Sequence, residues 1–268
     1  MQQRQLSGAT RVYFIVGDPI AQVKSPAGVT DLMQARGVNA VCVPAHVKAN
    51  DLSTFMQGIE SMQNVDGIIV TVPHKIAFTE LCDKVSDTSR FLNTVNTIRR
   101  TEQGWEADMF DGVGHVNALL KNGAELKNKR VILAGAGGAG TAIAHDLLMK
   151  GVKELAIHDP DQQRREVLVE RLNSLNLGKV YSGSSDPSGY DVVINASPLG
   201  MKAGDPLPFD GDKITKDMFI SDVVTAPEIT AWIQHARDVG CRTSTGIDMF
   251  LCVRDLMVDF LLEKSEQA

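Results

Sequence analysis

Residues 131–140 read VILAGAGGAG, an apolar run that opens directly into a glycine-rich turn. A stretch with helical spacing (141–150) follows, and the next apolar run, ELAIH (154–158), is closed by Asp159. The order of strand, glycine turn, helix, strand and acidic residue is typical of a dinucleotide-binding βαβ unit. A glycine-rich turn without a ligand is the simpler alternative, but the flanking strands and the acid favour nucleotide binding.

The glycines of this turn take separate roles in such a unit. Gly135 permits the tight turn, Gly137 lets the backbone approach a pyrophosphate, and Gly140 lets the helix pack closely on the strand. The helix that begins here offers free N–H groups and the positive end of its dipole to the pyrophosphate. The residues predicted to bind the cofactor at this turn are Gly135, Ala136, Gly137, Gly138 and Ala139.

Length, charge and cysteine content exclude several classes of protein. The 268 residues suffice for one large domain or two of ordinary size, and the net charge of −6 argues against nucleic acid or an anionic membrane as a partner. No apolar run approaches the ~18 residues of a membrane-spanning helix, and the first residues contain no apolar signal core. The scattered cysteines and histidines show no metal-ligand spacing, so we expect reduced thiols, no metal and a cytoplasmic protein.

Hydrophobic periodicity predicts an α/β protein with two domains. In the first hundred residues, strands are expected over 12–16, 40–44, 66–72 and 93–99, helices over 26–36 and 51–62, and a hairpin-like turn at Gly104. A second block carries strands near 131–134, 154–158, 179–181, 191–195, 218–224 and 241–244, and an amphipathic helix over 248–262 ends the pattern. We expect an α/β domain of residues 1–107 together with 248–268, with a parallel-rich sheet, and a doubly wound Rossmann domain of residues 108–247.

Motifs outside the glycine turn resemble those of the shikimate dehydrogenase family, in order from residue 16 to about residue 253. They are Gly17–Pro26 (GDPIAQVKSP), Gly67–Lys75 (GIIVTVPHK), Asn93–Thr97 (NTVNT), Ala107–Gly114 (ADMFDGVG), Asn195–Met201 (NASPLGM), Asp222–Pro227 (DVVTAP) and Gly246–Met249 (GIDM). The resemblance implies that the first domain binds a hydroxylated cyclohexane or cyclohexene carboxylate and that the Rossmann domain binds NAD(P). Hydride would pass between the cofactor and the C3 hydroxyl or ketone of shikimate or a relative, as in aromatic amino acid biosynthesis.

The resemblance places a catalytic pair at Lys75 and Asp111. Oxidation of a secondary alcohol needs a hydride acceptor and a group that takes the hydroxyl proton. Lys75 follows a strand end and a proline, so it can project from the carboxyl edge of a sheet, and a lysine screened from water can act as a base. Asp111 would hold the ammonium group and accept a hydrogen bond from the substrate hydroxyl. A surface ion pair is the alternative for two such residues taken alone.

The remaining site residues also come from the resemblance. Ser25 corresponds to one of two serines that bind the substrate carboxylate, although it could instead cap a helix before Pro26. His74 is expected to line the site without a catalytic role. The predicted substrate-binding residues are Val23, Ser25, Thr71, Asn96, Thr225 and Val253, and further cofactor-binding residues are Asp159, Ala196, Ser197 and Gly246.

Several of these positions depart from the family pattern. Val23 replaces a serine, Ile69 an asparagine, Met109-Phe110 an Asn-Thr pair, Thr225 a tyrosine and Val253 a glutamine. Each lost hydrogen bond to a carboxylate weakens binding by about 1.5–3 kcal/mol unless another group, such as the charge of Lys24 or Arg254, replaces it. The sequence therefore predicts either weak binding of shikimate or a related substrate: quinate, an amino-shikimate or a less polar ring alcohol.

The residues after the second strand of the Rossmann domain bear on the choice of cofactor. NADP-preferring members carry Asn-Arg-Thr there, whereas this chain has His158-Asp159-Pro160. A carboxylate at this place accepts hydrogen bonds from the free ribose hydroxyls and repels a 2′-phosphate, so NAD is expected to be preferred. NADP remains possible because Arg164 and Arg165 follow at the start of a helix and could fold back onto a phosphate.

Two alternatives to this dehydrogenase are left open by the sequence. One is a non-catalytic sensor that binds nucleotide or cyclitol in the same cleft, although a sensor has no need of Lys75 and Asp111. The other is a dehydrogenase on a similar two-domain fold, such as the folate-linked methylene dehydrogenases, which lack these cleft motifs. A monomer and a homodimer are both compatible with the sequence.

Overall fold

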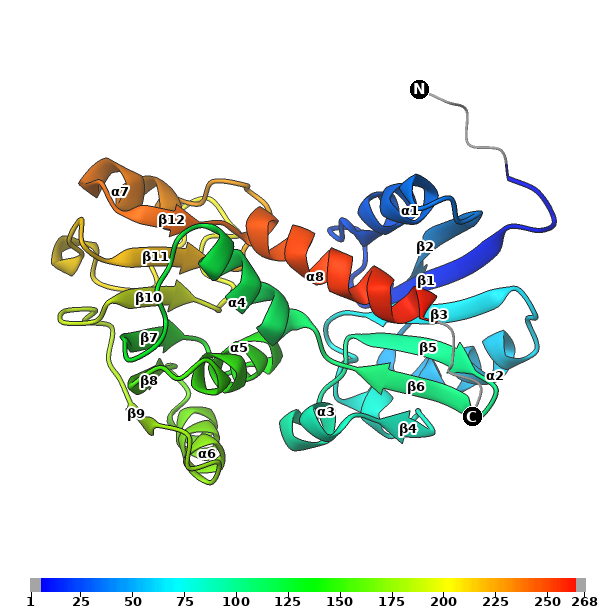
Figure 1. Cartoon of the computed structure of the whole chain (residues 1–268), viewed down its shortest axis with the longest axis horizontal. Coiled ribbons are helices and arrows are strands. Elements are labelled where there is room, and N and C mark those ends of the chain that lie inside the picture. The colour runs from blue at the N-terminus through cyan, green and yellow to red at the C-terminus, as the bar shows by residue number, and fades with distance from the viewer. Residues whose placement is uncertain (1–5, 264–268) are drawn as a thin grey trace. The chain divides into compact units, whose positions relative to one another are not determined.

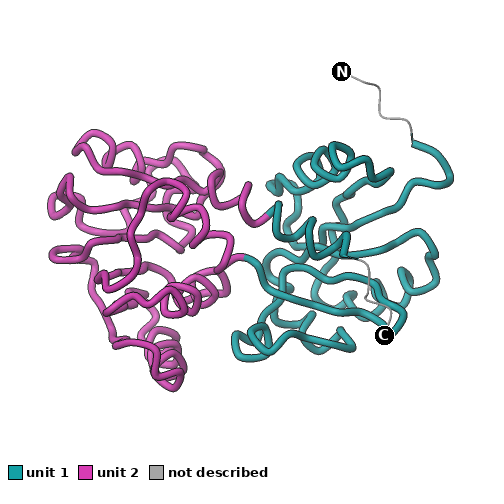
Figure 2. Tube along the Cα trace, viewed as in Figure 1, with its two compact units in different colours: residues 1–110, 254–268 teal, residues 111–253 magenta. Residues whose placement is uncertain are grey.

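The computed structural model describes residues 6–263, and the chain divides into two compact units (Figure 2). Unit 1 comprises Met1–Phe110 and Arg254–Ala268, and unit 2 comprises Asp111–Val253. Each unit is built on its own six-stranded sheet (Figure 1). Among the described residues, no helix is both long enough and apolar enough to cross a membrane.

The sheet of unit 1 is mixed. Its strand order is β2 (Ala40–His46), β1 (Arg11–Gly17), β3 (Val65–Val70), β5 (Thr97–Thr101), β6 (Gly104–Asp108) and β4 (Lys84–Val85). Strands β2, β1 and β3 run parallel, as a parallel-rich sheet requires, whereas β5 is antiparallel to both β3 and β6. The accompanying helices are α1 (Ser25–Ala35), α2 (Leu52–Glu60) and α3 (Asp87–Leu92), with short 3₁₀ turns at Ala49–Asp51 and Ala77–Thr79.

The strand predicted over 93–99 was wrong in its first half. Helix α3 precedes it, capped by Ser86, whose hydroxyl accepts a hydrogen bond from the backbone N–H of Ser89 at 3.1 Å. Asn93 then ends the helix with a left-handed φ of 53°, a conformation that asparagine tolerates better than most residues. The chain therefore enters the sheet only at Thr97.

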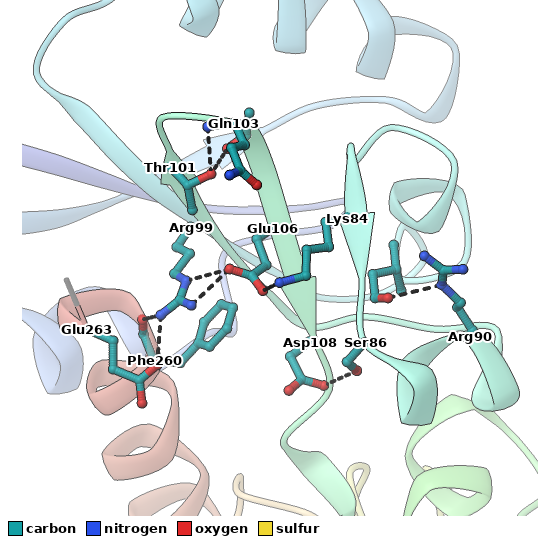
Figure 3. A network of polar contacts seen from close by, with 12 residues as sticks. Lys84, Ser86, Arg90, Arg99, Thr101, Gln103, Glu106, Asp108, Phe260 and Glu263 are labelled. Atoms are coloured by element: carbon teal, nitrogen blue, oxygen red, sulfur yellow. Dashed lines mark hydrogen bonds and ion pairs between the residues drawn. The ribbon is translucent and has the colours of Figure 1, made fainter. Parts of the chain in front are cut away.

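A polar network fastens the end of helix α8 (Gly246–Leu262) to the sheet of unit 1 (Figure 3). Arg99 on β5 lies 2.8 Å from Glu106 and 2.7 Å from Glu263, and its guanidinium stacks 4.4 Å from the centre of the Phe260 ring. Lys84 approaches the other oxygen of Glu106 at 2.7 Å. Because Arg99 and Glu106 are largely screened from solvent, this network orients α8 more firmly than exposed ion pairs would.

Unit 2 is a doubly wound parallel sheet, which confirms the predicted fold class. Its order is β12 (Arg242–Ser244), β11 (Phe219–Asp222), β10 (Val192–Asn195), β7 (Arg130–Ala134), β8 (Glu154–His158) and β9 (Lys179–Ser182). The sequence order reverses between β10 and β7, where such sheets bind ligands at the carboxyl ends of their strands. The helices are α4 (Asp111–Lys121), α5 (Gly138–Met149), α6 (Gln162–Asn173) and α7 (Ala231–Val239), with the start of α8 and a 3₁₀ turn at Gly211–Lys213.

Candidate active site

The glycine turn of unit 2 lies at this switch point, between β7 and α5. Gly135 has a φ of 104°, and a Cβ added to it would lie 2.7 Å from the carbonyl oxygen of Ala196 and 2.9 Å from the backbone nitrogen of Ser197. Only glycine combines that conformation with such an approach. Three residues predicted to bind the cofactor therefore meet at the carboxyl ends of β7 and β10.

The start of α5 has no side-chain cap on its backbone N–H groups. Gly137 is the N-cap residue, no side chain caps the helix there, and a Cβ on Gly137 would meet nothing within 4 Å. Gly140 instead packs so tightly that its Cβ would collide with the carbonyl oxygen of Gly135. The backbone of the first helical turn, which includes Gly138 and Ala139, is thus open to a pyrophosphate, while the helix is held close to the strand.

The Asp159 carboxylate is buried and already accepts hydrogen bonds from the protein backbone, which the sequence did not indicate. Its side chain is 5% exposed, and its two carboxylate oxygens accept hydrogen bonds from the backbone N–H of Ala136 at 2.7 Å and of Asp161 at 2.9 Å. The carboxylate thereby ties the glycine turn to the turn after β8. Each oxygen retains a lone pair that a ribose hydroxyl could use.

A pocket of about 300 Å³ adjoins the glycine turn and helix α6. Its lining consists of Ala136, Thr141, Asp161, Gln163, Arg164, Val167, Leu168 and Arg171. Arg164 lies 3.5 Å from the carboxylate of Asp161, and both side chains are about half exposed. Arg165 differs, because its guanidinium donates to the carbonyl oxygen of Asp159 at 2.9 Å. Of the two arginines considered for a phosphate contact, Arg164 is therefore the one that lines the pocket.

A buried network holds the ends of β10 and β11. The Asn195 amide donates to Asp222 at 3.0 Å, and its oxygen accepts from the Ser197 hydroxyl at 2.6 Å. Asp222 also accepts from the Thr230 hydroxyl at 2.6 Å. Burial raises the pKa of Asp222 to about 6, against the effect of its hydrogen-bond donors. The network fixes the loop that contains Ala196 and Ser197.

Lys75 and Thr71 of unit 1 follow the carboxyl end of β3, as predicted. The backbone N–H of Thr71 donates to the Val16 carbonyl at 3.0 Å, and the carbonyl of Lys75 accepts from Val95 at 3.0 Å. His74, between them, is 1% exposed, and its Nε2 lies 2.7 Å from the Val47 carbonyl oxygen. The loop is therefore pinned on both sides, and His74 serves to hold it.

Asn96 fixes the segment that leads to Asp111. Its side chain is 2% exposed, and its oxygen accepts hydrogen bonds from the Thr97 hydroxyl at 2.9 Å and from the Phe110 backbone N–H at 3.0 Å. Asp108, at the end of β6, accepts from the Ser86 hydroxyl at 2.5 Å (Figure 3). Two side-chain anchors thus precede the first residue of α4.

Ser25 is the first residue of α1 and is buried, 7% exposed. Lys24 takes the N-cap position, and no side-chain hydrogen bond caps the helix, so the capping role considered for Ser25 is wrong. Val23, two residues earlier, is partly exposed. The Ser25 hydroxyl therefore makes no capping hydrogen bond to its own helix.

Asp111 begins α4 in unit 2 and is 7% exposed. The next residues let other helices approach closely: a Cβ on Gly112 would collide with the Ala142 carbonyl oxygen, and a Cβ on Gly114 would collide with Val253. Val253 is therefore packed beneath α4. Thr225 lies in the loop after β11, and Gly246 begins α8 with its backbone against Val223 and Val224.

The predicted site residues are thus distributed over both units. Unit 1 holds Val23, Ser25, Thr71, Lys75 and Asn96, and unit 2 holds Asp111, Thr225, Val253 and the residues expected to bind the cofactor. Residues 6–263 contain no cluster of three or more side chains suited to a metal ion.

One buried polar residue near Asp111 was missed from the sequence. His115 lies four residues after Asp111 on α4 and is fully buried. Its spacing was visible as an i, i+4 pair, which shares one face of a helix. Nothing in the sequence distinguished it from an exposed histidine, because its burial depends on how α4 packs.

Comparison with known proteins bears on both units. The model of the shikimate dehydrogenase substrate binding domain matches residues 15–98. The shikimate dehydrogenase (NADP(+)) of Rubrobacter xylanophilus is 33% identical over 258 residues, which cover 94% of this chain and 90% of that protein. Shikimate 5-dehydrogenase from Listeria monocytogenes, solved with shikimate and NAD, superimposes with a TM-score of 0.89 at 26% identity, covering 97% and 94% of the two chains. Quinate dehydrogenase from Corynebacterium glutamicum, solved with NAD, gives a TM-score of 0.86 at 26% identity and 94% coverage of each chain.

Proposed function

This chain belongs to the shikimate dehydrogenase family as an NAD(P)-dependent dehydrogenase, and we propose that it oxidises or reduces C3 of shikimate or a close relative. The observation that carries the proposal is the near full-length similarity to shikimate dehydrogenases, which spans both the Lys75 loop and the Asp111 helix. In this proposal, unit 1 binds the substrate and unit 2 binds the nucleotide. It places the enzyme in the cytoplasm and, if shikimate is the substrate, in aromatic amino acid biosynthesis.

Lys75 and Asp111 are proposed as the catalytic pair. Bound nicotinamide supplies a hydride acceptor for the alcohol or a donor for the ketone. Lys75 takes the proton of the C3 hydroxyl on oxidation and returns it on reduction, while Asp111 orients the ammonium group and accepts a hydrogen bond from the substrate. Ser25, Thr71 and Asn96 supply polar contacts to the carboxylate and ring hydroxyls.

The chain's glycine turn fits the nucleotide. Gly137 leaves open space above the start of α5, and Gly135 brings the Ala196–Ser197 segment alongside. NAD is the proposed preferred cofactor, because Asp159 places a negative charge at the turn after β8 where a 2′-phosphate would be repelled. NADP is the alternative, and the presence of Arg164 in the adjoining pocket supports it.

The substrate class is proposed from the altered residues. Val23 offers no hydroxyl next to Ser25, so the carboxylate is held by fewer donors than in the family pattern. Quinate is the second candidate, since a quinate dehydrogenase superimposes nearly as closely as the Listeria shikimate enzyme, at the same 26% identity.

Initial rates with shikimate and with quinate, each with NAD and with NADP, test the proposal by absorbance of the reduced nicotinamide. Turnover should fall by about 10²–10⁴ in Lys75→Ala, which loses the proton acceptor. Lys84→Ala is a matched control, because Lys84 is a lysine of the same unit whose partner is Glu106. Nucleotide binding without turnover of either substrate would refute the proposal and favour the sensor.

A further inference from the structure

His115 is a fully buried histidine one helical turn after Asp111, and the proposed reaction does not use it. Residues four apart share a helix face, and side chains on a helix lean toward its N-terminus. The His115 ring therefore lies over the turn that carries Asp111. The electrostatic interaction between the two side chains agrees with this placement, since the Asp111 carboxylate favours the charged imidazolium.

The two ring nitrogens of His115 have unequal surroundings. Nε2 lies 3.3 Å from the hydroxyl oxygen of Ser221, at the carboxyl half of β11. Nδ1 is buried and has no hydrogen-bond partner among the described residues. Burial also lowers the pKa of His115 to about 4, so the ring is neutral and carries a single N–H near neutral pH.

The ring has little freedom to turn away, because both sides of the first turn of α4 are closely packed. Gly112 abuts α5 at Ala142 and at the carboxylate of Asp146, and Gly114 abuts Val253 on α8. The titratable groups around this turn include Asp111 itself and, on α5, Asp146 and the buried His145, whose Nδ1 lies 3.4 Å from the Asp146 carboxylate. A neutral ring that accepts from Ser221 through Nε2 presents its proton at Nδ1.

We propose that His115 is a positioning residue for Asp111: Nε2 accepts a hydrogen bond from the Ser221 hydroxyl, and Nδ1–H donates one to the Asp111 carboxylate in its working conformation. The inference rests on the proposed function, because it assumes that Asp111 acts on substrate. Its consequence is that the buried Asp111 carboxylate is held in the orientation that the reaction needs.

Two amide variants separate the two nitrogens. The amide of Asn reaches the place of Nδ1, whereas the amide of Gln reaches the place of Nε2. We expect His115→Asn to keep kcat within about threefold, and His115→Gln and His115→Phe to lower kcat by about 10- to 100-fold with KM little changed.

A purely structural role gives a different pattern. If Gln preserves kcat and Asn does not, or if all three variants leave kcat unchanged, the proposal is wrong. A direct measurement that needs no variant is the tautomer of His115 from ¹⁵N NMR of the intact chain. We expect the Nδ1–H form, and the Nε2–H form would overturn the proposal.

Asp111→Asn and Lys75→Ala, assayed alongside, separate this inference from the proposed function. If Asp111→Asn and Lys75→Ala lose activity while the His115 variants keep the wild-type kcat, only the positioning role is wrong. If both retain activity with shikimate and quinate, the proposed catalytic pair itself is wrong, and the positioning role falls with it.

Discussion

Replacement of His115 by Phe tests whether a neutral histidine is buried beside Asp111. The ordinary pKa of histidine is 6.5, and burial lowers that of His115 to about 4. Below pH 6.5 this histidine is protonated in the unfolded chain, whereas in the folded chain it becomes protonated only near pH 4. Because the unfolded state binds more protons over this range, acid destabilises the folded state through this group. The stabilising contribution is present above pH 6.5 and is lost as the pH falls.

The loss is large enough to measure. Between pH 6.5 and pH 5 the linkage removes about 2 kcal/mol from the free energy of unfolding, and about 3 kcal/mol by pH 4. Asp222 works in the opposite direction, because its pKa is raised from 3.8 to about 6 and its ionisation with rising pH disfavours the folded state. Asp222 is present in both proteins, so it cancels when the wild type and His115→Phe are compared at each pH.

Urea unfolding between pH 5 and pH 8 provides the assay. The chain has two tryptophans, Trp105 in unit 1 and Trp232 in unit 2. In a Trp105→Phe background, fluorescence reports on unit 2, which contains His115. The wild-type free energy of unfolding should fall more steeply on acidification than that of the variant. A difference between the two proteins that does not change with pH would refute a buried neutral His115.

Three further outcomes are expected. Gly135→Ala should lower the melting temperature and abolish nucleotide binding, because a side chain there is strained at φ 104° and meets the backbone of Ala196; normal binding in a nucleotide titration would contradict this. Asp159→Asn should raise the NADP-to-NAD ratio of kcat/KM about tenfold or more by removing a charge. The amide accepts only through its oxygen and so loses one of the two backbone bonds, which affects both cofactors, and the ratio isolates the charge; an unchanged ratio would mean that Asp159 is only structural. Val23→Ser should lower the KM for shikimate about tenfold, as expected for one added hydrogen bond to a carboxylate; no change in KM would place the carboxylate elsewhere.

The glycine turn was predictable because its determinants are local. The positive φ of Gly135 and the close packing of Gly140 follow from the strand–turn–helix pattern alone. The two hydrogen bonds that Asp159 accepts were not predictable, because they require the backbone N–H groups of Ala136 and Asp161 to point at one carboxylate. Sequence reasoning located the acid correctly but could not show that two backbone groups already bind it.

Segments whose structure depends on distant partners were predicted less well. Residues 93–96 alternate like a strand, but a local cap by Ser86 begins a helix that Asn93 closes. Asn96 turns its side chain inward to accept a hydrogen bond from the backbone N–H of Phe110, a residue of a later segment. The burial of His115 likewise follows from α4 packing against its neighbours. Such outcomes reflect tertiary contacts, which local propensity does not encode.

The residues that depart from the family pattern differ in how deeply they are buried. Ile69 and Met109 are buried, 3% and 4% exposed, and the Phe110 ring packs 5.4 Å from that of Phe260. Ile69 and Met109 are thus buried, and a polar side chain returned at either position needs a partner, since an unpaired buried donor costs about 1–3 kcal/mol. Val23 is partly exposed and precedes a serine whose hydroxyl its own helix does not use. Val23 is therefore the altered position of unit 1 at which we propose that an added hydroxyl changes substrate affinity without first burying an unpaired donor.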